Sequence, residues 1–156
     1  ETAYAGQRVA VNISGTSLDK VKRGDVLTDP KRFPATGCID VNATVLASFT
    51  EPVVLLLGGR DKNLPWSDLA QVIHQRVDRV IIFGEASSKI ENAIGQPQGN
   101  LISVATFETM KEALVEASNT AKAGDVVLLS PGCTSYDAYK DFEERGEEFR
   151  KWVNEL

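Results

Sequence analysis

Three short polar segments follow apolar runs in this sequence, and they carry the residues best suited to chemistry. They are residues 58–63 (Gly-Gly-Arg-Asp-Lys-Asn), 84–88 (Gly-Glu-Ala-Ser-Ser) and 130–137 (Ser-Pro-Gly-Cys-Thr-Ser-Tyr-Asp). Lys62 offers a positive charge. Hydroxyl groups that can hydrogen-bond an anion come from Ser130, Thr134 and Ser135. A helix after the third segment would add backbone N–H donors at its first turn. Together these groups predict a pocket for a small dicarboxylate.

Alternating strand-type and helix-type patterns surround these segments from about residue 42 onward. Apolar runs predict strands at Pro52–Leu57, Arg79–Phe83, Leu101–Val104 and Val126–Leu129. Helical spacing predicts helices at Val41–Phe49, Ser67–Arg76 (with Ser67 as N-cap), Ser87–Ile94, Thr109–Ala121 and about Tyr136–Asn154. This alternation favours right-handed crossovers and a mostly parallel sheet with helices on both faces. We therefore predict an α/β fold.

In an open parallel sheet, ligands bind in the crevice beyond the carboxyl ends of the strands. All three polar segments follow predicted strands, so we expect them to lie at the same edge. The expected pocket-loop residues are Gly58, Gly59, Asp61, Ser130 and Thr134.

The first 36 residues show a different pattern. Gln7–Ile13 alternates polar and apolar side chains, as a half-buried strand does, and Pro30 and Pro34 interrupt regular structure. We predict a short β segment over 1–36 and an α/β domain over 37–156.

Composition and charge exclude several classes of function. The 156 residues are 42% hydrophobic and carry a formal net charge of −5, which argues against nucleic-acid binding. The sequence has no apolar run of transmembrane length and no signal-peptide pattern, so we expect a cytoplasmic protein without a membrane partner. Cys38, Cys133 and His74 are the only cysteines and histidine. We expect no metal site and no cofactor in this chain, a structural role for His74, and no group that activates Cys133.

Two motifs resemble the C-terminal domain of the Mur peptide ligases, in particular those that add D-glutamate. The family's Gly-Gly-x-Asp-Lys motif is matched by residues 58–62. Its Ser-Pro-x-x-x-Ser-x-Asp-x-Phe/Tyr-x-x-Phe-x-x-Arg-Gly pattern is matched by residues 130–146. The resemblance extends from about Asn42 to Leu156 and implies a Rossmann-like domain.

The resemblance also implies roles for individual residues. The family's lysine binds the incoming D-glutamate, which is the role of Lys62 here. The second serine and the phenylalanine contact the D-glutamate carboxylate, which implies these roles for Ser135 and for Phe142 (through its backbone or by packing). Only Asn42 matches the family's Asp-Ser-Lys-Ala-Thr-Asn segment, so ATP-site residues and one D-glutamate contact are missing.

Mur ligases use ATP and Mg²⁺, and three domains, to form the peptide bond. This sequence has no phosphate-binding P-loop and no room for the UDP-binding domain. We therefore expect the chain to bind D-glutamate weakly and not to catalyse ligation on its own.

A second resemblance concerns the N-terminal segment. Residues 5–27 resemble part of the second β-barrel domain of translational GTPases of the selenocysteine-specific elongation factor type, and the similarity covers about residues 1–34. A junction at about 35–41 implies a chimera. GTP hydrolysis is not expected, because the GTPase P-loop is absent.

Two other functions stay open at this point. One is a non-enzymatic interaction domain without a ligand, which forms a homodimer through the edges of its N-terminal strands. The other is an RNA-associated module that depends on the basic residues Arg8, Lys20, Lys22, Arg23, Lys31 and Arg32.

The site residues also have structural interpretations. Asp61 and Lys62 could form a solvated turn pair, and Ser135 could be a helix N-cap. Phe142 would pack in the core on the helix face of Phe149 and Trp152. The charged residues of the last helix would form a solvated face; they are Lys140, Glu143, Glu144, Arg145, Glu147, Glu148, Arg150 and Lys151.

Overall fold

The computed structural model describes residues 45, 46, 48–63 and 65–156. The chain divides into two compact units, Glu1–Ala35 and Thr36–Leu156, and all described residues belong to the second. The predicted β segment of residues 1–36, Cys38 and Asn42 therefore lie outside the described residues.

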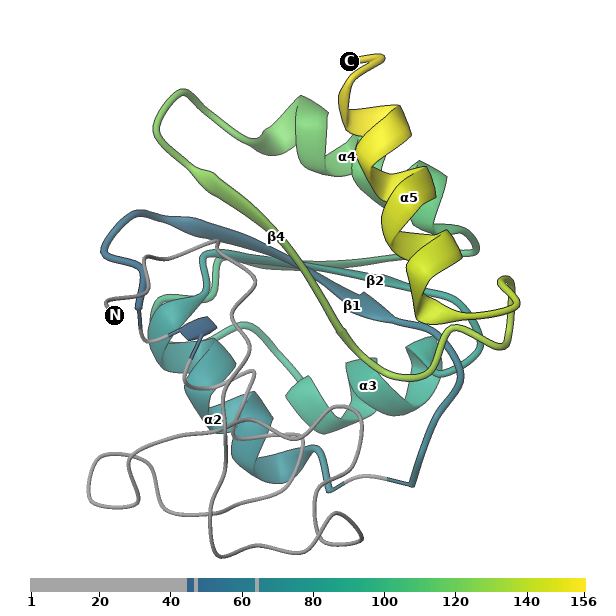
Figure 1. Cartoon of the computed structure of the whole chain (residues 1–156). Coiled ribbons are helices and arrows are strands. Elements are labelled where there is room, and N and C mark those ends of the chain that lie inside the picture. Colours follow the sequence, from purple (N-terminus) through teal and green to yellow (C-terminus); the bar gives the residue numbers. More distant parts are fainter. Residues whose placement is uncertain (1–44, 47, 64) are drawn as a thin grey trace, which may run out of the picture. The chain divides into compact units, whose positions relative to one another are not determined.

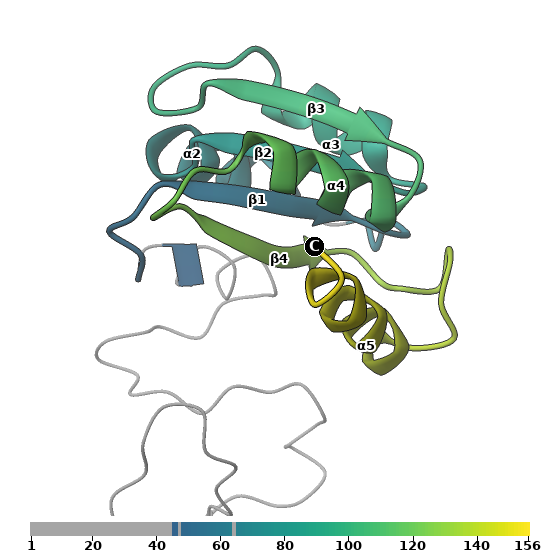
Figure 2. The ribbon, with the colours of Figure 1, turned by 90° about the horizontal axis from the view of Figure 1, so that it is seen from above.

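Four parallel strands form the sheet of the second unit. They are β1 (Val53–Gly58), β2 (Arg79–Phe83), β3 (Ser103–Phe107) and β4 (Val126–Gly132), in the spatial order β3-β2-β1-β4 (Figures 1 and 2). Central strand β1 is buried along its whole length, because both sheet faces are covered. The chain adds strands in one direction from β1 to β3 and then returns to place β4 on the other side of β1. The boundary between β1 and β4 is therefore the topological switch point.

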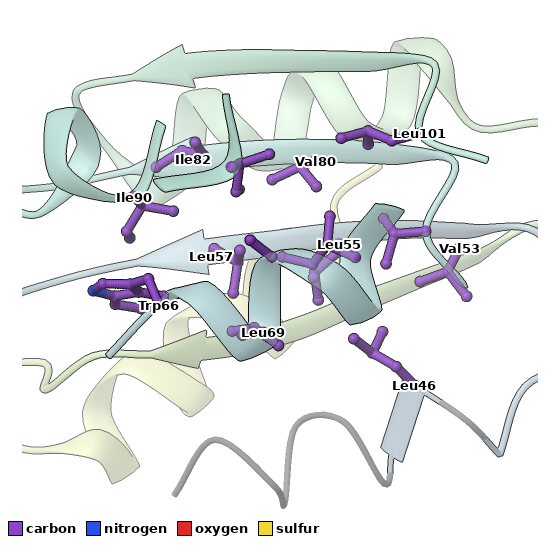
Figure 3. Packing of buried hydrophobic residues seen from close by; sticks show 14 of the residues in the cluster. Leu46, Val53, Leu55, Leu57, Trp66, Leu69, Val80, Ile82, Ile90 and Leu101 are labelled. Atoms are coloured by element: carbon purple, nitrogen blue, oxygen red, sulfur yellow. The ribbon is translucent and has the colours of Figure 1, made fainter. Parts of the chain in front are cut away.

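Helices cover the two faces of the sheet in pairs. On one face lie α2 (Ser67–Arg76) and α3 (Ser87–Ile94), and on the other lie α4 (Met110–Thr120) and α5 (Phe142–Val153) (Figure 1). Side chains alternate along β1, as strand geometry requires. Val53, Leu55 and Leu57 point to α2 and α3, where Leu69 and Ile90 complete the cluster (Figure 3). Val54 and Leu56 point to the opposite face, where they pack with residues of α4.

Local hydrogen bonds fix the starts of α4 and α5. Thr109 Oγ1 accepts from the backbone N–H of Glu112 at 3.2 Å, and the Glu112 carboxylate accepts from the backbone N–H of Thr109 at 3.0 Å. This reciprocal capping box satisfies two N–H groups that the helix leaves without partners. Asp141 caps α5 by accepting from the Glu144 N–H at 2.8 Å.

The predicted α/β fold is confirmed, and most element boundaries agree with the sequence. Ser67 is not the N-cap of α2: Trp66 occupies that position, and the Ser67 hydroxyl donates to Asp68 Oδ1 at 3.3 Å. The third strand begins at Ser103 instead of Leu101.

The last helix begins at Phe142 and not at Tyr136. The Ser135 carbonyl accepts from the N–H groups of Ala138 and Tyr139, at 3.2 and 2.8 Å, so the chain makes a separate turn before the helix. Ser135 is therefore not a helix N-cap. The helix also starts too late to present its first-turn N–H groups beside residues 130–135, because Asp141 caps it.

Candidate ligand site

The loops after β1 and β4 are joined directly at the switch point. Arg60 and Thr134 form an isolated antiparallel bridge, in which each backbone N–H donates to the other residue's carbonyl at 3.0 Å. The Thr134 hydroxyl also donates to the Arg60 carbonyl, at 3.2 Å. Two of the polar segments therefore meet at the carboxyl edge of the sheet, as the sequence predicts.

The third polar segment, residues 84–88, is bound to the first. The Gly59 N–H donates to Phe83 O at 3.1 Å, and the Ala86 N–H donates to Gly59 O at 2.9 Å. Gly58 has a φ of +148°, and a Cβ built on it would lie 1.9 Å from Phe83 O. Only glycine fits this close approach of two backbones. The two glycines at positions 58 and 59 therefore allow the loop after β1 to pack against the end of β2 and the loop after it.

Asp61 is engaged by its neighbours. Its carboxylate pairs with the Lys89 ammonium group from α3, and its Oδ1 accepts from the Asn63 N–H at 3.0 Å. The hydrogen bond from Lys89 is the main reason that the pKa of Asp61 lies below its usual value of 3.8. Asp61 thus stabilises the turn of the loop and forms an ion pair with Lys89.

Lys62 extends from the same loop, and its side chain is exposed. No ion pair joins it to another residue in the described part of the chain. Its positive charge nevertheless acts on the Cys133 thiol in the loop after β4, where it lowers the pKa against the effect of burial. The charge of Lys62 therefore acts at the edge where the loops meet.

Ser135 and Phe142 differ sharply in burial. Ser135 is 3% exposed and follows the bridging residue Thr134, so it lies at the predicted edge. Phe142 is 56% exposed at the first position of α5. The interpretation of Phe142 as a core residue is wrong. Phe149 and Trp152 pack against the cluster on the α4 side of the sheet, whereas Phe142 stands at the first position of α5 and is not part of that cluster.

Cys133 lies inside the loop after β4 and is 4% exposed. Burial is the largest of the effects that raise the pKa of its thiol to about 11, and the negative charge of Asp61 adds to it. A thiol with this pKa is protonated at neutral pH and is a poor nucleophile. This agrees with the prediction that nothing activates Cys133.

Arg145 is the residue of this region whose position the sequence interpretation missed. Its helix was expected to carry it on a solvated face, but it is 8% exposed. Both Nη1 and Nη2 donate to the Cys133 carbonyl, at 3.4 Å each. Burial lowers the pKa of the guanidinium group, and the negative charge of Asp137 acts in the opposite direction. The signal was helical phase: Arg145 lies four residues before Phe149, on the face that packs.

His74 has the structural role that was expected. Its Nε2 lies 2.9 Å from the carbonyl oxygen of Ile94, and its Nδ1 lies 3.3 Å from that of Gln98. The ring therefore ties α2 to the segment that follows α3.

The loops after β1 and β4 place Lys62 and Ser135 at one edge of the sheet. A groove of about 350 Å³ lies next to it, between α4 and α5, with Asp137, Tyr139, Lys111 and Trp152 in its lining. Lys62 and Ser135 do not line this groove. Within residues 45, 46, 48–63 and 65–156, no group of three His, Cys, Asp or Glu side chains could hold a metal ion. No helix in the same part of the chain is long and apolar enough to cross a membrane.

The fold is that of an open parallel α/β domain, the class in which ligands bind beyond the carboxyl ends of the strands at the switch point. Residues 38–133 match the family model "Mur ligase, glutamate ligase domain", and the chain belongs to this family. The matched region includes the loop with Lys62 and ends just before Thr134 and Ser135.

Relatives of known name support the assignment. The chain is 43% identical over 119 residues to the UDP-N-acetylmuramoylalanine–D-glutamate ligase of Salinibacter ruber, covering 75% of this chain and 25% of the relative. It is 40% identical over 108 residues to the ligase of the same name from Syntrophus aciditrophicus, covering 69% and 23%. It is 37% identical over 130 residues to the ligase of the same name from Desulfatibacillum aliphaticivorans, covering 82% of this chain and 28% of the relative.

The chain thus spans about a quarter of the length of the curated relatives that it matches. The predicted membership of the Mur ligase family is confirmed. The resemblance of residues 5–27 to translational GTPases stays a prediction.

Proposed function

We propose that this domain is the amino-acid-binding part of an ATP-dependent peptidoglycan-precursor ligase, and that its ligand is D-glutamate. One observation carries the proposal: the Arg60–Thr134 bridge brings the loop of Lys62 and the loop of Ser135 to one edge of the sheet. The relatives described above are all UDP-N-acetylmuramoylalanine–D-glutamate ligases, which suggests D-glutamate as the ligand.

The charges of the site suit a small dicarboxylate. Lys62 is the exposed cation of the first loop, since the neighbouring cations Arg60 and Lys89 already pair with Glu85 and Asp61. We assign Lys62 to one carboxylate of the ligand and the Ser135 hydroxyl to a second contact. Phe142, exposed at the first position of α5, would form the wall, in keeping with the expectation that this residue acts through its backbone or by packing.

The affinity for D-glutamate should be weak, because its contact with Lys62 would be an exposed ion pair. An exposed ion pair contributes only about 0–1 kcal/mol, because water and salt screen it. Binding of free D-glutamate by this chain should therefore be weak, and closure by another domain would strengthen it.

Ligation itself would need parts beyond the described residues. In the proposed reaction class, ATP activates a carboxylate and the amino group of the amino acid then attacks it. This domain would contribute proximity by holding the amino acid in place. The family's ATP-contact segment aligns with residues 37–42, which lie outside the described structure and match only at Asn42. We therefore propose that the chain alone binds and does not catalyse.

The N-terminal unit forms a separate part of the proposal. We infer that residues 1–34 derive from a translation-factor β-barrel, which would make the chain a chimera in a cytoplasmic setting. The alternative is an interaction domain that self-associates through strand edges. Size-exclusion chromatography with and without D-glutamate distinguishes them: a ligand-independent dimer supports the alternative.

An amide NMR titration of the 156-residue chain tests ligand binding. With D-glutamate we expect shifts in residues 58–63 and 130–142, and with L-glutamate none of similar size. Lys62→Met should abolish the shifts, whereas Lys151→Met, which removes an exposed lysine at the far end of α5, should leave them intact. The absence of D-specific shifts up to tens of millimolar would overturn the proposal.

A further inference from the structure

A buried guanidinium group, that of Arg145, lies at the meeting point of the loops. Arg145 projects from α5, and its two terminal nitrogens donate to the carbonyl of Cys133, one residue before Thr134. Burying a cation is costly unless it is paired and hydrogen-bonded. The contacts of Arg145 show which parts of the chain this buried group holds in place.

The first of these parts is the loop that carries Lys62. A Cβ built on Gly59 would lie 3.2 Å from Arg145 Nη1 and 2.2 Å from the Thr134 carbonyl oxygen. The guanidinium group thus packs against the backbone of Gly59, which leaves room for it. One side chain contacts the loop after β1 and the loop after β4 together.

The second part is the loop after β2, which is reached through Asp137. The carboxylate of Asp137 acts electrostatically on Arg145, and its Oδ2 accepts from the Glu85 N–H at 3.4 Å. A Cβ built on Gly84 would lie 2.4 Å from the same oxygen. Asp137 is half-buried and belongs to the same loop after β4 as Cys133, so it joins the loop that Arg145 holds to the loop after β2.

Geometry explains why this position holds an arginine and not a lysine. A planar guanidinium group presents several N–H donors in fixed directions, whereas an ammonium group is a compact point charge. Arg145 uses two donors on one carbonyl and places Nη1 next to Gly59. A lysine could replace the charge but not the simultaneous contact with two loops.

We propose that Arg145, with Asp137, is the positioning residue of the site: it sets the separation between Lys62 and Ser135 that the ligand requires. The consequence for ligand binding rests on the proposed function. The claim that Arg145 and Asp137 hold the three loops together does not rest on the proposed function. The guanidinium group of Arg145 is hydrogen-bonded to the Cys133 carbonyl and packs against Gly59, so its effect passes through the backbone of residues 59 and 133.

The test compares Arg145→Met, Arg145→Lys and Arg150→Met in the full chain. Arg150 is the matched control, because it is exposed in the same helix and its Nε donates only to Gly146 O at 3.2 Å. In Arg145→Met we expect amide hydrogen exchange at Arg60, Thr134 and Glu85 to accelerate about tenfold or more, as loss of a charge-assisted hydrogen bond would cause. Exchange at Leu56 in the core of β1 should change little. Arg145→Lys should be intermediate, and Arg150→Met should behave as wild type.

The same variants are titrated with D-glutamate. Arg145→Met should weaken binding about tenfold or more, and Arg145→Lys should restore part of it. A folded Arg145→Met protein with wild-type exchange at the three loop amides would overturn the proposal. If Arg145→Met does not fold, Asp137→Asn decides: the proposal requires faster exchange at Glu85, and unchanged exchange there refutes it. If wild type binds no D-glutamate, the proposed function fails, while the exchange measurements still decide the positioning role.

Discussion

Arg60 and Thr134, which follow the ends of the parallel strands β1 and β4, donate their backbone N–H groups to each other's carbonyls at 3.0 Å. Beyond this short antiparallel bridge, the loops with Lys62 and Ser135 share one edge of the sheet. The local geometry of the loops depends on glycine, burial and charge in ways that variants can measure.

Close backbone approach at Gly58 predicts a large cost for any side chain there. Gly58→Ala places a Cβ 1.9 Å from Phe83 O at a φ of +148°. We expect a loss of about 3 kcal/mol or more in the free energy of unfolding, since strain and clash act together. The control is Gly95→Ala, whose φ is +68° with no atom within 4 Å of the new Cβ. It should cost about 1–2 kcal/mol from backbone strain alone. Equal losses in urea denaturation would contradict this explanation.

The two phenylalanines of α5 should differ in their effect on stability. Phe142→Ala should change the free energy of unfolding by less than about 0.5 kcal/mol, because the side chain is 56% exposed. Phe149→Ala should cost about 2 kcal/mol, because Phe149 packs against the cluster under α4 and α5. Chemical denaturation of both variants measures the difference. A larger effect of Phe142 would show that it packs against a part of the chain outside the described residues.

The Asp61–Lys89 pair predicts a loss of stability in acid. The pKa of Asp61 is lowered in the fold, mainly by the hydrogen bond from Lys89. The folded state therefore holds its proton less tightly than the unfolded state, and the contribution is present above the usual pKa of 3.8 and lost as the pH falls below it. The Lys89→Met variant should be less stable than wild type at neutral pH, and this gap in the free energy of unfolding should shrink below about pH 4. A gap that stays constant down to pH 2 would contradict the assignment.

Burial of Cys133 predicts an opposite effect in base. The folded thiol ionises near pH 11 and the usual value is 9.0, so the unfolded state loses its proton first. Stability should fall as the pH rises from 9 to 11. In a Cys38→Ser background, Cys133→Ala should remove this slope and add only a pH-independent packing loss. Thiol labelling at pH 8 gives a second readout: the native protein should react slowly and the unfolded protein quickly.

The sequence predicted the central elements well, for physical reasons. The β2 strand and helices α2 and α3 have the predicted boundaries, because apolar runs end there at residues that favour turns. The candidate loops were found because strand ends in a parallel sheet share an edge. Lys62 and Ser135 lie where this rule and the family motif place them.

The errors have one common source, which is competition between local signals and tertiary contacts. Residues 136–141 have helix-compatible side chains, but the turn at Ser135 and the cap at Asp141 delay α5. Arg145 was assigned to solvent because charged residues are rarely buried. Its hydrogen-bond partner is the backbone carbonyl of Cys133, and the negative charge of Asp137 acts on it from the same loop; only the folded chain shows these neighbours.

The partners of the bridge are far apart in the sequence. Arg60 and Thr134 are separated by 74 positions, and the chain must complete β2, β3 and β4 before they can meet. Contacts of such high sequence separation are slow to form, since the loop-closure entropy must be overcome first. The edge that holds Lys62 and Ser135 should therefore be among the last regions to become ordered during refolding. Recovery of ligand binding would then report the completed topology, later than any signal from the strands themselves.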